Sequence, residues 1–201
     1  MTPLVNRLEF EDFARSKGCL RIAGLDEAGR GPLAGPVVSA AVILPDDFSL
    51  NGVDDSKKVS EKKRELLAFK ICEQCEVGIG IVTSESIDSV NIRNASLESM
   101  RKAVKMLDYK PDCILVDGNA EIDCGIYEIT IVKGDSRSLS ISAASIVAKV
   151  FRDRIMKEYS SEFPEYMFDK HKGYPTKKHK EIIAEFGLTP FHRKTFNYKL
   201  K

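Results

Sequence analysis

The 201-residue sequence lacks several patterns that define large classes of proteins. No stretch approaches the roughly 18 apolar residues that cross a membrane, and the N-terminus lacks the apolar core of a signal peptide. We therefore expect a cytoplasmic protein with no membrane partner. The five cysteines are an odd number spread over a long chain, which fits reduced thiols better than a disulfide framework.

Ligand patterns for zinc and for nucleotide phosphates are also missing. The three histidines, His171, His179 and His192, show no ligand spacing. Cys72 and Cys75 form a single C-x-x-C pair, whereas a structural zinc site needs a second pair, so core thiols are favoured over a redox or metal role. The chain has no G-x-x-x-x-G-K-[ST] loop, which disfavours a nucleotide-dependent phosphoryl transferase.

The net charge of +1 conceals a segregation of charges along the chain. Residues 170–201 contain nine Lys or Arg and two Glu, a net of +7, so residues 1–169 sum to −6. A basic end beside an acidic body suits a polyanion partner and a carboxylate-rich centre, although a solvated basic surface is the alternative on charge alone. The length and the 43% hydrophobic content indicate one domain, or one domain with an appendage.

Hydrophobic periodicity predicts an α/β fold. Apolar, partly β-branched runs bounded by Gly or Pro predict strands within residues 20–26, 35–45, 76–84, 111–118 and 127–135. Helical spacing predicts helices over residues 59–75, 95–108 and 140–163, the last of which stops before Pro164. Strands joined directly pair antiparallel, and strands separated by helices tend to pair in parallel. We therefore expect a mixed sheet covered by helices.

Acidic residues stand at the ends of three predicted strands. Asp26 and Glu27 close the first strand, Asp117 closes the fourth, and Asp135 follows the fifth. A turn-forming role is the alternative for each Asp, but carboxylates gathered at strand ends predict a cleft that binds Mg²⁺ or Mn²⁺. Adjacent strand residues point to opposite faces. We therefore expect that the strand breaks at this pair, or that one of the two residues contributes its backbone carbonyl.

Six sequence motifs together carry a family resemblance. They are AGLDEAGRGPLAGPVVSAAVIL, DDSKKVSEKKRELL, ILVDGN, KGDSRSLSISAASIVAKVFRDRIM, HKGYPT and LTPFHRKTF. In this order, and across roughly residues 19–196, the chain resembles bacterial ribonuclease HII. The related ribonuclease HIII is disfavoured, because members of that family are longer and have an additional N-terminal domain. It also carries Ser and Lys where this loop has Ala28 and Arg30.

The resemblance implies an endonuclease with the ribonuclease H-like fold, a central mixed five-stranded sheet flanked by helices. Such an enzyme hydrolyses the RNA strand of RNA/DNA hybrids and cuts 5′ of a single ribonucleotide embedded in duplex DNA, leaving 3′-hydroxyl and 5′-phosphate ends. The four metal-binding acids of the family match Asp26, Glu27, Asp117 and Asp135, and two ions, Mg²⁺ or Mn²⁺, are expected.

The resemblance also implies a domain organisation. We assign residues 1–160 to a ribonuclease H-like catalytic domain and residues 161–201 to a basic C-terminal helical extension packed on it. We expect a monomer, because no long apolar stripe is left over.

Substrate recognition is implied for a glycine-rich loop and a tyrosine. In the family, the segment matching Gly29, Arg30 and Gly31 contacts the 2′-hydroxyl of the ribose. The tyrosine matching Tyr174 packs on the deoxyribose beyond the RNA–DNA junction. A plain turn is the alternative for the loop, and a buried core residue is the alternative for Tyr174.

Basic residues elsewhere are candidates for phosphate contacts. They are Lys57, Lys58, Arg193 and Lys194, each of which is otherwise a surface cation. Arg152 and Asp153 are expected to form a local ion pair, with a supporting role at the metal site as the alternative. A protein that only binds nucleic acid would explain the basic end of the chain, but it would not explain four acids at strand ends.

Overall fold

A single mixed sheet of five strands organises the molecule. The computed structural model describes residues 7–46, 48 and 60–198. The strands lie in the order β3-β2-β1-β4-β5. Their bounds are β1 Ile22–Ala28, β2 Val37–Ile43, β3 Glu76–Val82, β4 Cys113–Asp117 and β5 Tyr127–Ile131. The pairs β1–β2 and β2–β3 are antiparallel, whereas β1–β4 and β4–β5 are parallel. The predicted mixed sheet is therefore confirmed.

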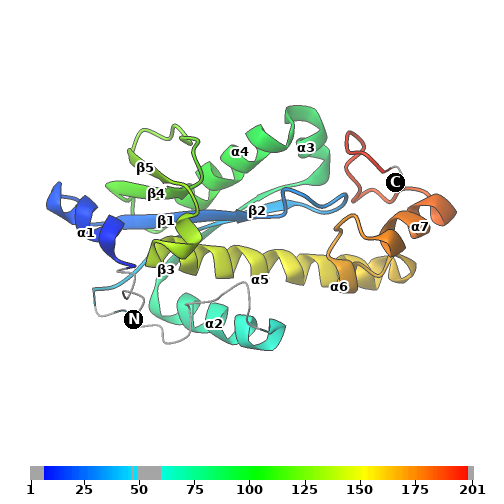
Figure 1. Ribbon diagram of the computed structural model, residues 1–201, viewed down its shortest axis with the longest axis horizontal. Coiled ribbons are helices and arrows are strands. Elements are labelled where there is room, and N and C mark those ends of the chain that lie inside the picture. Colours follow the sequence, from blue (N-terminus) through cyan, green and yellow to red (C-terminus); the bar gives the residue numbers. More distant parts are fainter. Residues whose placement is uncertain (1–6, 47, 49–59, 199–201) are drawn as a thin grey trace, which may run out of the picture.

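Helices connect the strands and cover both faces of the sheet. Their bounds are α1 Glu9–Ser16, α2 Glu61–Gln74, α3 Ser84–Val90, α4 Ile92–Lys105, α5 Leu139–Glu162, α6 Phe168–His171 and α7 Lys177–Phe186, with short 3-10 turns η2 Gly134–Ser136 and η3 Pro164–Tyr166. Figure 1 shows α3 and α4 above the sheet, with α5 and α2 below it. Among the described residues, no helix has both the length and the apolarity needed to cross a membrane.

The core consists of two layers because successive residues of a strand point to opposite faces. Ala40 and Val42 of β2 pack with α2 and α5, whereas Ala41 between them packs with α4. The layers approach closely at Gly24 of β1, where an added Cβ would lie 2.2 Å from the carbonyl carbon of Ser140. Helix α5 therefore lies directly against the strand that carries the first two predicted acids.

The last part of the chain packs on the C-terminal half of α5. A cluster of buried residues joins Met156 of α5 to Ala34 in the loop after β1 and to residues of η3, α6 and α7, namely Tyr166, Phe168 and Ile182. Helix α5 continues to Glu162, so it spans the boundary proposed at residue 160. The division into a catalytic domain and an extension stays a prediction.

Candidate active site

The register of the sheet brings two predicted acids to the same level. Strand β1 pairs with β4 from Ile22 to Leu25, and the last pair is Leu25 with Val116. Asp26 and Asp117 are the next residue on each strand. Beyond this point β1 continues to Ala28 and pairs only with β2. The end of the parallel pairing thus leaves an opening beside Asp26.

A cavity of about 410 Å³ occupies this opening. It is lined by residues of β1 and the following loop, by Asp117, by residues of α2 and α5, and by Tyr174. Seven predicted site residues meet there: Asp26, Glu27, Asp117, Gly29, Arg30, Gly31 and Tyr174. The structure therefore joins the acids to the glycine-rich loop and the tyrosine. Lys57 and Lys58 lie outside the described residues.

Asp26 and Glu27 reach the cavity from an unbroken strand. Of the two alternatives, the strand break is wrong, because β1 runs through both residues to Ala28. The contribution of a backbone carbonyl stays a prediction. Both residues nevertheless line the cavity. Glu27 and Asp117 also line a second, smaller cavity of about 80 Å³ beside α4. Since β4 no longer flanks β1 here, the opening extends around the strand, and neighbouring residues that point to opposite faces can both border it.

Burial and mutual repulsion disfavour the charged forms of two of these acids. The pKa of Asp26 is raised well above its ordinary value, first by burial and then by repulsion from Glu27 and Asp117. Burial also raises the pKa of Glu27, and the Arg30 guanidinium, 3.2 Å from Glu27 Oε1, opposes this shift. Carboxylates held in this way favour a cation among them.

Backbone and hydroxyl donors orient the acids. Asp26 Oδ1 accepts a hydrogen bond of 2.7 Å from the Glu27 N–H, and Ser145 of α5 also hydrogen-bonds the Asp26 carboxylate. Asp117 Oδ1 accepts a hydrogen bond of 2.6 Å from the Gly134 N–H. A Cβ at Gly134 would lie 2.6 Å from Ile141 Cδ1, so a glycine suits this close approach.

Asp135 lies beside the cavity but does not border it. Lys133 has a left-handed φ of 57° and turns the chain from β5 into η2, where Asp135 follows Gly134. Asp135 is half-buried and is not among the described residues that line the cavity. Three of the four predicted acids therefore meet, and the fourth is one residue from the backbone donor that binds Asp117.

The donors at this site fit a hard cation in their chemistry. Carboxylate oxygens are the ligands that Mg²⁺ and Mn²⁺ prefer. Within the described ranges, no three His, Cys, Asp or Glu side chains are arranged closely enough to hold an ion as they stand. The residues thus match the predicted metal by donor type and charge, and their side chains are not drawn together around an ion.

Two buried arginines fix the loop that follows β1. The Arg152 side chain donates to the carbonyls of Ala34, Pro36 and Lys172 at 2.9–3.0 Å. The Arg193 side chain donates to the carbonyls of Arg30 and Gly35 at 3.0 Å and to that of Gly29. Both guanidinium groups therefore bind backbone carbonyls, and these bonds fix the path of the loop.

These contacts correct two expectations. Arg193 is predicted to contact phosphate, but it is 0% exposed. Its guanidinium donates to the carbonyls of the loop instead, so Arg193 stabilises the loop. Arg152 does not form the expected hydrogen-bonded ion pair with Asp153, because Asp153 pairs with Lys149 instead. Neighbouring helical residues diverge, whereas residues four apart lie on one face.

The glycine-rich loop and Tyr174 face one another across a narrow space. Gly29 has a φ of +103°, and a Cβ there would lie 2.2 Å from Arg152 Nε, so the loop requires glycine. A Cβ at Gly31 would meet Tyr174 Cε1 at 3.8 Å. Tyr174 is 41% exposed, which excludes the alternative of a buried core tyrosine.

Three polar residues that line the cavity escaped sequence reasoning. They are Arg64 of α2 and Ser145 and Lys149 of α5. The signal in the sequence was weak but present, because Ser145 and Lys149 are polar residues four apart within the apolar run of the long predicted helix.

Comparisons with known proteins agree on one family. The family model described as Ribonuclease HII matches residues 23–199. The ribonuclease HII of Geotalea uraniireducens (strain Rf4) is 53% identical over 190 residues, which cover 94% of this chain and 88% of that protein. The crystal structure of the ribonuclease H2 from Pyrococcus horikoshii OT3 is 29% identical with a TM-score of 0.78, covering 89% of this chain and 95% of that one.

A more distant structure shares the fold. Bst-RNase HIII in complex with Mn²⁺ is 20% identical with a TM-score of 0.74, covering 92% of this chain and 70% of that one. The predicted preference for type II over type III is confirmed by the family match and by the identity of the curated relatives. The chain therefore belongs to the ribonuclease HII family and is a metal-dependent nuclease that hydrolyses the RNA strand of RNA/DNA hybrids.

Proposed function

We propose that this enzyme also cuts duplex DNA on the 5′ side of a single embedded ribonucleotide, leaving 3′-hydroxyl and 5′-phosphate ends. The observation that carries this proposal is the shared cavity, which joins the acids Asp26, Glu27 and Asp117 to the loop Gly29–Gly31 and to Tyr174. A single ribonucleotide differs from its neighbours by one 2′-hydroxyl. Residues that read one sugar must therefore lie beside those that hydrolyse the next linkage.

We further propose that Asp26, Glu27, Asp117 and Asp135 hold two Mg²⁺ or Mn²⁺ ions. The raised pKa values of Asp26 and Glu27 support a cation at this place. When bound, a pair of such ions supplies Lewis acidity toward water and toward the departing 3′ oxygen. Asp135 must approach the cavity to do so, and it directly follows Gly134, whose N–H donates to Asp117.

The chain itself supplies orientation. Ser145 holds the Asp26 carboxylate, and the Gly134 N–H holds that of Asp117, so neither acid must be ordered when substrate arrives. Arg30 pairs with Glu27 at 3.2 Å while its own side chain is 56% exposed. The exposed guanidinium is therefore positioned to contact a phosphate next to the acids.

The loop and the tyrosine supply selectivity for the sugar. Backbone groups of Gly29 to Gly31 can both donate to and accept from a 2′-hydroxyl, because no side chain blocks the approach at the glycines. The ring of Tyr174 opposite Gly31 offers an apolar face to a deoxyribose. This arrangement favours a ribose followed by a deoxyribose.

The test is an end-labelled DNA duplex with one ribonucleotide, incubated with Mg²⁺, Mn²⁺ or chelator. The proposal predicts one metal-dependent cut on the 5′ side of the ribonucleotide, and no cut in the all-DNA duplex. A uniform RNA/DNA hybrid is the positive control for the nuclease. Cleavage of the hybrid without cleavage at the single ribonucleotide would contradict the proposal.

A further inference from the structure

The cavity has a basic wall as well as an acidic one. Asp26, Glu27 and Asp117 come from β1 and β4, whereas Arg64 and Lys149 come from α2 and α5. Both basic residues are half-buried. Metal binding explains the acidic wall, but it does not explain the basic wall. Two cations that line the same cavity as the acids are placed to contact a polyanionic substrate that enters it.

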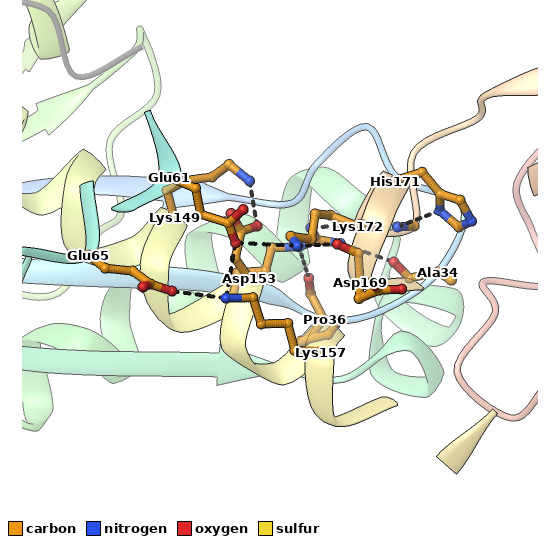
Figure 2. A network of polar contacts seen from close by, with 12 residues as sticks. Ala34, Pro36, Glu61, Glu65, Lys149, Asp153, Lys157, Asp169, His171 and Lys172 are labelled. Atoms are coloured by element: carbon orange, nitrogen blue, oxygen red, sulfur yellow. Dashed lines mark hydrogen bonds and ion pairs between the residues drawn. The ribbon is translucent and has the colours of Figure 1, made fainter. Parts of the chain in front are cut away.

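The geometry of α5 directs Lys149 to this wall. Ser145, Lys149 and Asp153 are four residues apart and share one face of the helix. Ser145 binds Asp26 at the acidic end, and the buried Asp153 forms an ion pair with Lys149 at the other end. Figure 2 shows this ion pair next to a separate group in which Glu61 joins Lys157 and Lys172.

Asp153 positions Lys149 without using its full binding capacity. An ammonium group has three N–H donors, and the ion pair with Asp153 uses one. Burial lowers the pKa of Lys149, Asp153 opposes that shift, and the nearby Arg152 and Arg64 add to the lowering. The remaining donors of Lys149 are therefore available to a further anion in the cavity that Lys149 and Arg64 both line.

We propose that Lys149 and Arg64 form a phosphate-binding subsite for the substrate strand, which holds a phosphodiester next to the scissile one. The proposal rests on the function assigned to this cavity. The acids with their metal ions take the linkage that is cut, and the basic wall takes a neighbouring phosphate of the same strand. The cavity of about 410 Å³ is large enough for a nucleotide unit, and Lys149 is a positioning residue of the reaction.

The experiment measures binding and cleavage separately. A fluorescent RNA/DNA hybrid is titrated with protein in chelator at several KCl concentrations, and single-turnover cleavage is measured with Mg²⁺ at saturating protein. For Lys149→Gln we expect roughly tenfold weaker binding and a salt-dependence slope smaller by about one. The saturating cleavage rate should stay within about threefold of wild type. Lys149→Arg should restore the slope, and Arg64→Gln should resemble Lys149→Gln.

Two controls distinguish a phosphate contact from a structural ion pair. Lys157 lies two turns further along α5, pairs with Glu61 and Glu65 at 3.0 and 2.9 Å, and is not among the described residues lining the cavity. Lys157→Gln should leave affinity and slope unchanged. In the double variant Lys149→Gln/Asp153→Asn, the weakened binding should persist, because the phosphate contact is still missing.

Three results would overturn the subsite. These are an unchanged salt slope in Lys149→Gln, recovery of affinity in the double variant, and a loss confined to the saturating rate. A wild-type protein that neither binds nor cuts the hybrid would instead refute the function assigned to the cavity, and the subsite with it. The two failures are therefore distinguishable.

Discussion

At the scale of single residues, the site combines unfavourable burial with useful chemistry. Asp26 is buried beside Glu27 and Asp117, and its pKa is raised by burial first. A carboxyl whose pKa is higher in the folded than in the unfolded state destabilises the folded state at neutral pH, because its ionisation costs more free energy there. Strand-end acids can be read from the sequence, since each follows an apolar run. Their burial and mutual distance depend on the register of β1 and β4, which the sequence does not display.

The first prediction concerns the stability of the metal-free protein. Asp26→Asn should raise the free energy of unfolding at pH 7 by about 1–2 kcal/mol, which raises the melting temperature by a few degrees for a chain of this size. The amide removes the disfavoured charge and keeps an oxygen acceptor for the Glu27 N–H. Thermal unfolding in chelator measures the change, and cleavage should be lost in the same variant. A lower melting temperature would contradict a net destabilising charge at Asp26.

At the scale of elements, the loop after β1 is shaped by two buried arginines from distant parts of the chain. Arg152 of α5 and Arg193 near the C-terminus bind the carbonyls of residues 29–36. The glycines of this loop were identifiable from sequence, because glycine next to strand-end acids is a local pattern. The arginines were not, since a charged residue in the sequence does not reveal whether it is buried. The sequence therefore predicts a phosphate contact at Arg193, where the structure has a buried support of the loop.

The second prediction contrasts the two glycines of the loop. Gly29→Ala should lower the free energy of unfolding by about 2–4 kcal/mol, because its φ is +103° and the new Cβ would clash with Arg152. Gly31→Ala should fold like wild type, since its Cβ would meet only Tyr174 at 3.8 Å. It should nevertheless lose cleavage at single ribonucleotides by at least about tenfold, because the methyl group occupies the space proposed for the sugar. Chemical denaturation and the cleavage assay measure both effects, and equal stability losses would contradict this account.

Short helices mark another limit of sequence reasoning. Helices α1 and α3 have eight and seven residues, and neither was predicted. Helix α3 starts at a Thr83 cap directly after β3, where the sequence favoured a longer strand. Elements of this length are determined by caps and by packing against the sheet, and hydrophobic periodicity needs a longer window. The long helices could be predicted from the helical spacing of their apolar residues, and the five strands from apolar runs bounded by Gly or Pro.

At the scale of the whole molecule, three histidines join separate segments of the C-terminal part of the chain to one another. The rings of His171 and His179 stack with centroids 4.1 Å apart, and His179 Nε2 lies 3.1 Å from His192 Nε2. His179 also binds the carbonyl of Tyr174. His179 Nδ1 carries the proton that it donates to Tyr174, and His192 Nδ1 accepts from the Thr189 N–H, so one proton between the two Nε2 atoms leaves both rings neutral. Burial lowers the pKa values of His179 and His192 to about 4. Neighbouring histidines add to this shift, and hydrogen bonds with the backbone oppose it.

The third prediction is an acid-sensitive stability. A histidine whose folded pKa is about 4 and whose unfolded pKa is about 6.5 takes up a proton on unfolding in the interval between them. Stability should therefore fall as pH decreases from about 6.5 toward 4, by up to about 1.4 kcal/mol per pH unit for each of the two residues. Urea unfolding at pH 7, 6 and 5 measures this slope. A free energy of unfolding that does not change between pH 6.5 and 5 would contradict it.

The central claim is that the acids at the end of β1 and β4 carry the nuclease chemistry. The most direct measurement is single-turnover cleavage of an RNA/DNA hybrid by Asp117→Asn, compared with Asp108→Asn, which changes an exposed acid after α4. Both variants should fold, since an amide oxygen can still accept from the Gly134 N–H. We predict that Asp117→Asn lowers the rate at least about 100-fold and that Asp108→Asn matches wild type. Full activity in Asp117→Asn would contradict the account.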